Sequence, residues 1–251
     1  MGANISGGIA FLGELALGVL KVALNPKAMR PTSMVFHLES FSLRAVPVIA
    51  TINFLVGCIV AQQGIFQLRR FGASDYAIDL VGVLVLRELG VLLTSIMVAG
   101  RTGSAITAEL GSMKMREEID ALRTMGLDPI EVLVLPRIIA LVVAVPMLTF
   151  LGAMAALYGA GLVCWLYGGM APEIFLERLG EAIWLPTFEV GMIKAPFMAL
   201  TIGLVACVEG FEVDGSAASL GQRTTASVVK SIFLVIALDG LFAMFFAGIG
   251  M

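Results

Sequence analysis

Charged residues are scarce in this sequence: Asp, Glu, Lys and Arg make up 14% of its 251 residues, whereas soluble domains average about 25%. The net charge of −3 offers no basic face to neutralise phosphates, which excludes a nucleic-acid module. Cysteine is also scarce. Cys58, Cys164 and Cys207 lie far apart in apolar runs, so we interpret them as small buried hydrophobic residues and not as a disulfide framework.

Apolar residues and glycine take the place of the missing charge. Hydrophobic residues make up 59% of the chain, and there are 28 glycines, a residue that is commoner in membrane helices than in soluble ones. This composition excludes a water-soluble enzyme and predicts a polytopic membrane protein. The predicted fold class is all-α, because open sheet edges are not tolerated in lipid.

Catalytic motifs are missing as well. The sequence has no Gly-x4-Gly-Lys-Ser/Thr loop to hold ATP phosphates. The single histidine, His37, has no neighbouring cysteine or acidic pair, so no metal site is predicted. Ser104 has no histidine on a span to serve as its base, which argues against an intramembrane hydrolase. We therefore expect a membrane component that takes its energy from a partner.

Five apolar regions predict transmembrane helices, each of which needs about 20 residues. The third is about 30 residues or about 45 Å long, and Pro146 is its expected hinge. The fourth is shorter and carries Lys194 and Pro196. The predicted spans are residues 45–68, 80–108, 138–167, 190–208 and 228–250.

The N-terminal apolar stretch at residues 9–24 is interrupted by Glu14 and Lys21. No basic residues precede it, as they would in a signal peptide. Its length favours a helix that lies in the membrane interface, with a sixth span as the alternative. We expect residues 1–38 to form a cytoplasmic and interfacial region and residues 39–251 to form the transmembrane domain.

Basic residues cluster on one side of the predicted spans. They precede the first span and fill the loops at residues 109–137 and 209–230, whereas the opposite loops carry Arg69, Arg70 and Arg178. The positive-inside rule then places the N-terminus and these two loops in the cytoplasm and the C-terminus outside. The basic residues on the cytoplasmic side are Lys21, Lys27, Arg30, Arg44, Lys114, Arg116, Arg123, Arg137, Arg223 and Lys230.

Four ionisable residues stand out within the predicted spans: Arg87, Glu88, Lys194 and Asp239. An ionisable residue in lipid is a functional candidate by default, although a polar cluster that only fixes helix packing is the alternative. The four sum to zero charge. Because neighbours at i and i+1 do not face each other on a helix, we expect Arg87 and Glu88 to pair with other helices or to point into different compartments.

Small residues recur every fourth position at the end of the second span, in two adjacent rows. They predict a flat strip for close helix packing, either within the chain or between subunits. One row is Ala99, Gly103, Thr107 and Gly111, and the other is Gly100, Ser104, Ala108 and Ser112.

The predicted cytoplasmic connector at residues 113–126 has the pattern of a short amphipathic helix. Met115, Ile119, Leu122 and Met125 would share one face, and Gly126 would end the helix. Such an apolar stripe suits a helix that lies on a surface or enters a partner's groove. The charged residues Glu117, Glu118, Asp120 and Arg123 occupy the rest of the helix.

The sequence from about residue 39 to the C-terminus resembles the MlaE-type permeases of ABC transporters that move phospholipids with MCE-domain proteins. One departure is Val91, where the family usually has proline, so the second span is expected to kink less or elsewhere. The resemblance is carried by Leu86-Arg-Glu-Leu-Gly90, by residues 98–111 and 118–129, by Pro136-Arg-Ile-Ile-Ala140, by Gly191-Met-Ile-Lys194, by Gly221-Gln-Arg-Thr-Thr225 and by Leu238-Asp239.

This resemblance implies a non-enzymatic transport subunit in the bacterial inner membrane. It would have five spans, an N-terminal interfacial helix and a coupling helix, and would work as a homodimer on phospholipid. A cytoplasmic ABC ATPase would bind ATP and Mg, so this chain would hold no cofactor. An MCE ring would sit on the outer side, and a small STAS-type protein is a further candidate partner.

The resemblance also implies site residues. Arg87, Glu88, Lys194 and Asp239 would form the polar core of a lipid pocket at the dimer centre. Its apolar walls would come from Val60, Ile65, Leu68 and Phe71. The ATPase-coupling residues would be those of the connector, Glu117, Glu118, Ile119, Asp120, Leu122, Arg123 and Met125.

Two other functions compete with a lipid permease. An ion-coupled secondary transporter would use Glu88, Asp239 and Lys194 as a relay, although the inverted repeats expected of that class are not evident. A scaffold that transports nothing would tolerate neutralisation of the intramembrane charges.

Overall fold

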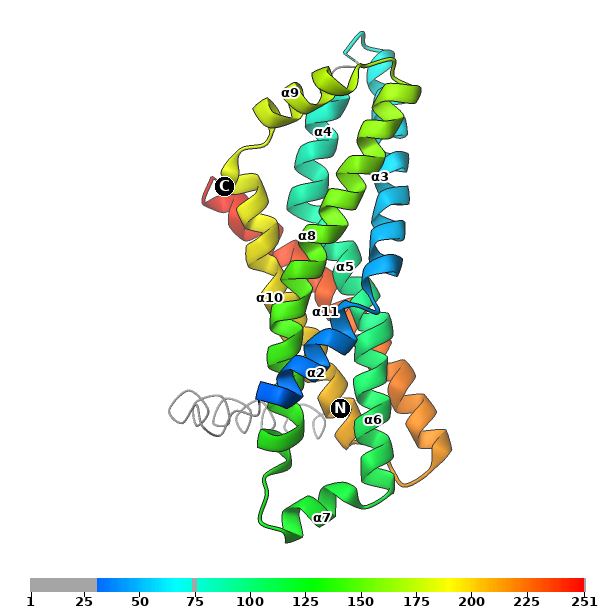
Figure 1. Cartoon of the computed structure of the whole chain (residues 1–251), viewed down its shortest axis with the longest axis vertical. Helices are drawn as coiled ribbons and strands as arrows, with labels where there is room; N and C mark the ends of the chain where they lie inside the picture. Colours follow the sequence, from blue (N-terminus) through cyan, green and yellow to red (C-terminus); the bar gives the residue numbers. More distant parts are fainter. Residues whose placement is uncertain (1–30, 74–75, 251) are drawn as a thin grey trace. The chain divides into compact units, whose positions relative to one another are not determined.

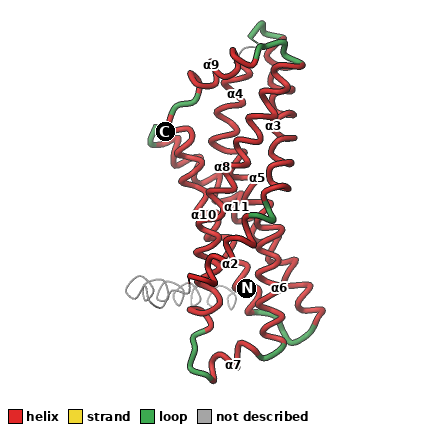
Figure 2. The backbone as a smooth tube through the Cα atoms, in the orientation of Figure 1, coloured by secondary structure: helices red, strands yellow, loops and turns green. Residues whose placement is uncertain are grey.

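The computed structural model describes residues 31–73 and 76–250, and every regular element within these ranges is a helix (Figures 1 and 2). The predicted interfacial helix at residues 9–24 lies outside the described residues. The elements are α2 (Pro31–Ser42), α3 (Val46–Arg69), α4 (Tyr76–Leu84), η2 (Val85–Leu89), α5 (Gly90–Val98), η3 (Ala99–Gly103), α6 (Ser104–Met115), α7 (Glu118–Thr124), η4 (Ile130–Val134), α8 (Leu135–Leu166), α9 (Pro172–Ala182), α10 (Leu185–Phe211) and α11 (Ala217–Gly248), where η marks a π-helical turn.

Five helical stretches are long and apolar enough to cross a membrane, which confirms the predicted all-α polytopic fold. Most extend beyond the predicted span because the helix continues past the apolar run into more polar sequence. Pro146 and Pro196 lie inside the unbroken helices α8 and α10. The helix also continues through Val91, directly after the π-helical turn η2. The stretches are Met34–Arg69, Tyr76–Met115, Ile130–Leu166, Pro186–Phe211 and Ala217–Gly248.

The chain forms two compact units, each built from segments far apart in sequence. In the described residues, the first unit holds 31–41, Val98–Ala144 and Ala199–Val235, which include α6 and α7. The second holds 42–73, 76–97, Val145–Met198 and 236–250, which include α3, α4 and α9. The predicted domain boundary between residues 38 and 39 falls inside α2.

In the second unit, α3 and α8 pack with their backbones in close contact (Figure 1). A Cβ atom on Gly57 would overlap the carbonyl oxygen of Ala156, and one on Gly159 would overlap the carbonyl oxygen of Phe54. The Cys58 thiol donates a hydrogen bond to the Gly159 carbonyl oxygen at 3.3 Å. Glycine therefore sets the spacing between these two helices.

Helix α9 is an element that the sequence analysis did not predict. Proline stands at its first position, where the missing N–H is harmless. Phe175 is buried in the core of the second unit, and Leu179 packs against that core. Arg178 donates to Asp79 of α4 at 3.2 Å and lies over the ring of Tyr76. These contacts hold α9 against α4 (Figure 1).

In the first unit, the first row of small residues packs within the chain. Gly103 contacts Ile202 of α10, and a Cβ on Gly111 would meet Val213 and Leu220 at 2.6 Å. Thr107 donates to the carbonyl oxygen of Ala206 at 2.9 Å. The row therefore fixes α6 against α10 and the start of α11.

The second row is more accessible than the first. Gly100 is exposed, and a Cβ added there would meet nothing within 4 Å. Ser104, Ala108 and Ser112 are half-buried. The sequence left open whether these rows pack within the chain or between subunits. The first row packs within the chain, and the second row forms a surface of small side chains.

The α3–α8 contact gives a direct test of this packing. Gly57→Ala would force the two backbones apart, and such overpacking typically destabilises a core by about 1–3 kcal/mol. We expect a lower thermal unfolding midpoint in detergent. Gly180→Ala is the matched control, because a Cβ there meets nothing within 4 Å. Equal midpoints for the two variants would contradict the packing assigned to α3 and α8.

Candidate functional site

Two of the four intramembrane charges, Glu88 and Asp239, converge on a third, Lys194 of α10, in the second unit. The Lys194 side chain is fully buried. Its ammonium Nζ donates to Glu88 Oε2 of η2 at 2.5 Å and to Asp239 Oδ1 of α11 at 3.1 Å. The structure thus brings residues from three helices, separated by 106 and 45 positions in sequence, into one contact.

Arg87 extends this cluster to a chain of four charges. Its Nε lies 3.6 Å from Glu88 Oε1, and Glu88 therefore contacts Arg87 on one side and Lys194 on the other. The prediction for Glu88 was right, since it pairs with another helix. The expectation that Arg87 and Glu88 would not face each other was wrong. Both belong to the π-helical turn Val85–Leu89, where the angular spacing differs from that of an α-helix, and both side chains are long enough to bend back.

A glycine one turn before Lys194 permits the approach. A Cβ atom on Gly191 would overlap the carbonyl oxygen of Leu86. Because Gly191 has no side chain, the backbone of α10 reaches the turn that carries Glu88, and Lys194 follows at the next turn. The motif Gly191-Met-Ile-Lys194 thus combines a close-contact residue with a charged one.

The charges in this cluster compensate one another. A buried ion is unfavourable by several kcal/mol unless its partners are well placed. Lys194 has two carboxylate partners, and Arg87 balances the second negative charge, so the four residues sum to zero formal charge. Arg87 and Glu88 are the accessible members, with side chains 22% and 23% exposed. A polar ligand would therefore meet these two first.

The four residues expected to form apolar walls differ in their surroundings. Ile65 is fully buried in the core of the second unit, with Val60 and Leu68 partly buried against it. Phe71, just after α3, is 81% exposed. Phe71 is therefore the most accessible of these four residues.

The connector at residues 113–126, which was predicted to be cytoplasmic, is two helices rather than one. Helix α6 ends at Met115, Glu117 adopts a left-handed conformation with φ 59°, and α7 covers Glu118–Thr124. The predicted helix over residues 113–126 is therefore shorter, and Met115 belongs to the preceding helix. Gly126 follows α7 with φ 76°, a conformation that glycine adopts without strain, as the C-terminal stop requires.

The predicted apolar stripe does not form one exposed face. Ile119 is buried at 3% exposure, Leu122 is half-buried, and Met125 is 65% exposed. Asp120 and Arg123 are exposed and form an ion pair at 3.3 Å. Ile119 therefore anchors α7 to its own chain, and Met125 and Leu127, which is 38% exposed, are the apolar surface at its end.

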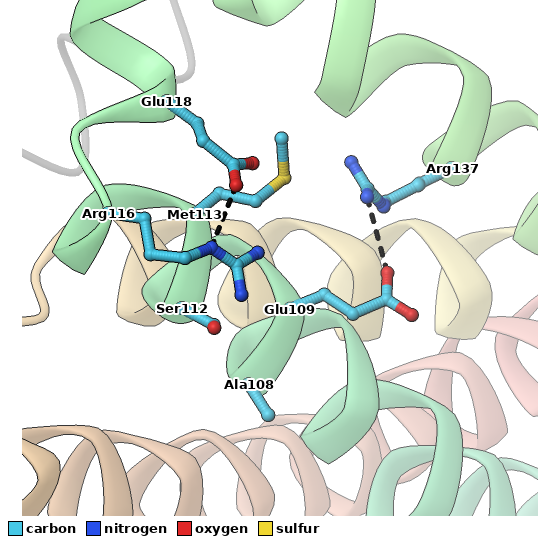
Figure 3. Close-up of a pocket in the computed structure, with 7 residues that line it drawn as sticks. All are labelled: Ala108, Glu109, Ser112, Met113, Arg116, Glu118 and Arg137. Carbon is cyan, nitrogen blue, oxygen red and sulfur yellow. Dashed lines mark hydrogen bonds and ion pairs between the residues drawn. The ribbon is translucent and has the colours of Figure 1, made fainter.

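A cleft of about 480 Å³ lies between α6, α7 and α8 in the first unit (Figure 3). Arg116 donates to Glu118 at 2.7 Å on one side of it, and Arg137 donates to Glu109 at 3.2 Å on the other. Arg137 is 6% exposed and also donates to the Leu133 carbonyl oxygen at 2.8 Å. The lining residues are Ala108, Glu109, Ser112, Met113, Arg116, Glu118 and Arg137.

Two features here were not identified from the sequence. Arg137 entered the sequence analysis only as a basic loop residue and as part of a motif, yet its side chain is buried and paired with α6. Glu209 follows the end of the predicted fourth span at residue 208, yet it is 2% exposed and contacts Arg223 and Lys230. The only sequence signal for Glu209 was its position directly after an apolar run. Across residues 31–73 and 76–250, no group of three His, Cys, Asp or Glu side chains could hold a metal ion.

Five helical stretches long and apolar enough to cross a membrane, three of which contribute to the charge cluster around Lys194, define a polytopic membrane protein. A family model described as Permease MlaE matches residues 34–245. The chain therefore belongs to the MlaE permease family, a family of transport subunits.

Relatives give the same assignment. The chain is 32% identical over 200 residues to a probable ABC transporter permease protein of Rickettsia typhi, which covers 80% of this chain and 77% of the relative. It is 29% identical over 218 residues to the intermembrane phospholipid transport system permease protein MlaE of Haemophilus influenzae. That alignment covers 86% of this chain and 84% of the relative. The chloroplastic protein TRIGALACTOSYLDIACYLGLYCEROL 1 of Arabidopsis thaliana is 29% identical over 93% of this chain and 65% of its own length. These matches support a membrane permease for lipid transport.

The charge cluster gives a prediction about stability. Lys194→Met would leave Glu88 and Asp239 as neighbouring carboxylates without their shared cation, and breaking a buried pair in this way costs about 3–5 kcal/mol. We expect a marked drop in the thermal unfolding midpoint in detergent. The triple variant Glu88→Gln, Lys194→Met, Asp239→Asn, which removes all three charges, should recover part of the loss. A Lys194→Met protein as stable as the wild type would contradict the pairing.

Proposed function

We propose that this chain is the permease subunit of an ATP-driven ABC transporter that moves phospholipids between membranes together with an MCE-domain protein. The observation that carries the proposal is the family match over residues 34–245, which includes both the charge cluster around Lys194 and the cytoplasmic helix α7. The charge cluster could bind a polar headgroup in an apolar surrounding, and α7 could bind a partner that supplies energy.

The proposed energy source is a cytoplasmic ABC ATPase docked on α7. The sequence has no phosphate-binding loop of its own. Helix α7 presents Met125 and the exposed ion pair of Asp120 and Arg123. The cleft behind it contains the ion pair Arg116–Glu118, which is open to solvent. An apolar anchor ringed by charges is the usual composition of a docking surface, so Met125 is the proposed anchor.

The proposed lipid contact is through Arg87 and Glu88. A guanidinium binds phosphate with two parallel hydrogen bonds, and Arg87 is the more exposed of the two cations in the cluster. Lys194 would hold Glu88 in place and balance its charge, and Asp239 would hold Lys194. Phe71, together with Val60, Leu68 and Ile65 if the core opens around them, would supply the apolar contact for the acyl chains.

The proposed assembly is a homodimer in a bacterial inner membrane, with the N-terminus cytoplasmic and the C-terminus periplasmic. The strip formed by Gly100, Ser104, Ala108 and Ser112 has the small side chains that allow close packing of a second copy. An MCE ring on the outer side and a small STAS-type protein complete the proposal. Mg and ATP would be bound by the ATPase and not by this chain.

Docking through α7 is tested by placing a charge on its apolar end. In the reconstituted complex, Met125→Asp or Leu122→Asp should abolish most ATP-dependent lipid transfer, since an unpaired carboxylate would be buried at the ATPase interface. Glu118→Lys should act in the same direction by reversing the charge beside Arg116. Fluorescent lipid transfer between vesicles and phosphate release measure the two activities. Thr124→Ser on the same helix is the control, and unchanged transfer by Met125→Asp would remove α7 from the proposal.

Headgroup contact by Arg87 is tested separately. Arg87→Ala should lower lipid transfer about tenfold or more, the effect of losing a charged hydrogen bond of about 1.5–3 kcal/mol. Assembly and ATP hydrolysis should persist. Arg70→Ala is the control, since Arg70 is an exposed arginine whose guanidinium lies over the ring of Phe66. Normal transfer by Arg87→Ala would show that the cluster only fixes helix packing.

A further inference from the structure

A second buried charge cluster lies in the first unit and has Glu209 of α10 at its centre. The Glu209 side chain is 2% exposed. Its Oε1 accepts a short hydrogen bond from Lys230 Nζ, and its Oε2 accepts from Arg223 Nη1 at 3.2 Å. Both cations belong to α11. One carboxylate thus joins α10 to two turns of the following helix.

The same part of α10 is tied to α6 by polar contacts. The Thr107 hydroxyl of α6 donates to the Ala206 carbonyl oxygen at 2.9 Å and lies 2.8 Å from the Ser227 hydroxyl of α11. Lys114 Nζ, at the end of α6, donates to the Phe211 carbonyl oxygen at 2.6 Å. Helices α6, α10 and α11 are therefore connected around Glu209.

The burial of this cluster is unequal. Glu209 is almost fully enclosed, whereas Arg223 and Lys230 have side chains 29% and 51% exposed. Removing the charge of Glu209 leaves two cations that water can still solvate. Removing both cations would leave a buried carboxylate without a partner, which is far less favourable. The Glu209→Gln change therefore weakens the connection between the helices without placing an unpaired charge in the core.

The three helices connected here also lead to the other candidate sites. Helix α6 continues through Arg116 and Glu117 into α7, the proposed docking helix. Along the chain, α10 also carries Lys194 and α11 also carries Asp239. The contacts among α6, α10 and α11 offer a path by which a displacement of α7 can be passed from α6 to α10 and α11.

We propose that Glu209 is a positioning residue for energy coupling: it holds the segments of α6, α10 and α11 in the first unit together, so that movement imposed on α7 is transmitted along α10 and α11. This proposal rests on the proposed ATP-driven function. Glu209 itself contacts neither lipid nor the ATPase in this proposal. Its effect is on the amount of lipid moved for each ATP hydrolysed.

The test uses the complete reconstituted complex and measures ATP hydrolysis and lipid transfer on the same sample. Glu209→Gln should assemble and hydrolyse ATP, while lipid moved per ATP should fall by about fivefold or more, the lower range of typical coupling between sites. Glu209→Asp, which keeps the charge, should recover part of the ratio. Glu212→Gln is the matched control. Glu212 is the other carboxylate partner of Arg223, and its side chain is 32% exposed. Its substitution should leave the amount of lipid moved per ATP unchanged.

A double variant distinguishes a connection from a general loss of stability. Lys230→Met combined with Glu209→Gln should lower the ratio little more than Glu209→Gln alone, because both changes break the same contact. An unchanged ratio in Glu209→Gln would overturn the proposal. The proposal would also be overturned if Glu209→Gln reduced assembly but the assembled complexes moved as much lipid per ATP as the wild type. If the wild-type complex moves no lipid with ATP, the proposed function fails instead, which is a separate result.

Discussion

The requirement that a fully buried ammonium group have compensating charge organises the second unit. Lys194 has no solvent exposure, and its two carboxylate partners come from η2 and α11. A cation in that position holds three helices to one arrangement, because separating any of them leaves an ion in a medium that solvates it poorly. Gly191 at the preceding turn makes the approach sterically feasible.

Close backbone contact at glycine recurs as the second organising feature. Gly57 and Gly159 bring α3 against α8, and Gly111 brings α6 against Val213 and Leu220. In lipid, helices gain little from burying apolar surface against each other, so small residues that allow tight contact and polar groups that bridge helices supply much of the association. The structure pairs these features. Gly191 lies beside the Lys194 cluster, and Gly210 follows Glu209 in sequence and lies close to Thr107, whose hydroxyl bridges α6 to α10.

Most of the fold could be predicted from the sequence, because long apolar runs identify spanning helices directly. The ion-pair partners of Lys194 were not predictable, since they depend on which helices lie side by side. The pairing of Arg87 with Glu88 was missed because a π-helical turn was not expected at residues 85–89. Helix α9 was missed although Phe175 and Leu179 have helical spacing. Glu209 was overlooked because it directly follows an apolar run, where a charge normally faces water.

The connector shows why a correct pattern can still mislead in detail. Met115, Ile119, Leu122 and Met125 fit one helical face, but the left-handed residue Glu117 ends one helix and starts another. Spacing alone contains no signal for such a break. As a result Ile119 is buried, and Met125 provides the exposed apolar contact.

We propose that this permease moves phospholipid with energy from ATP hydrolysed by a partner. The most direct measurement is lipid transfer between vesicles by the purified wild-type complex, with ATP in one reaction and an imposed pH gradient without nucleotide in another. The account predicts transfer that requires hydrolysable ATP and is indifferent to the gradient. Transfer driven by the gradient through this chain alone would contradict the proposed function and favour an ion-coupled transporter.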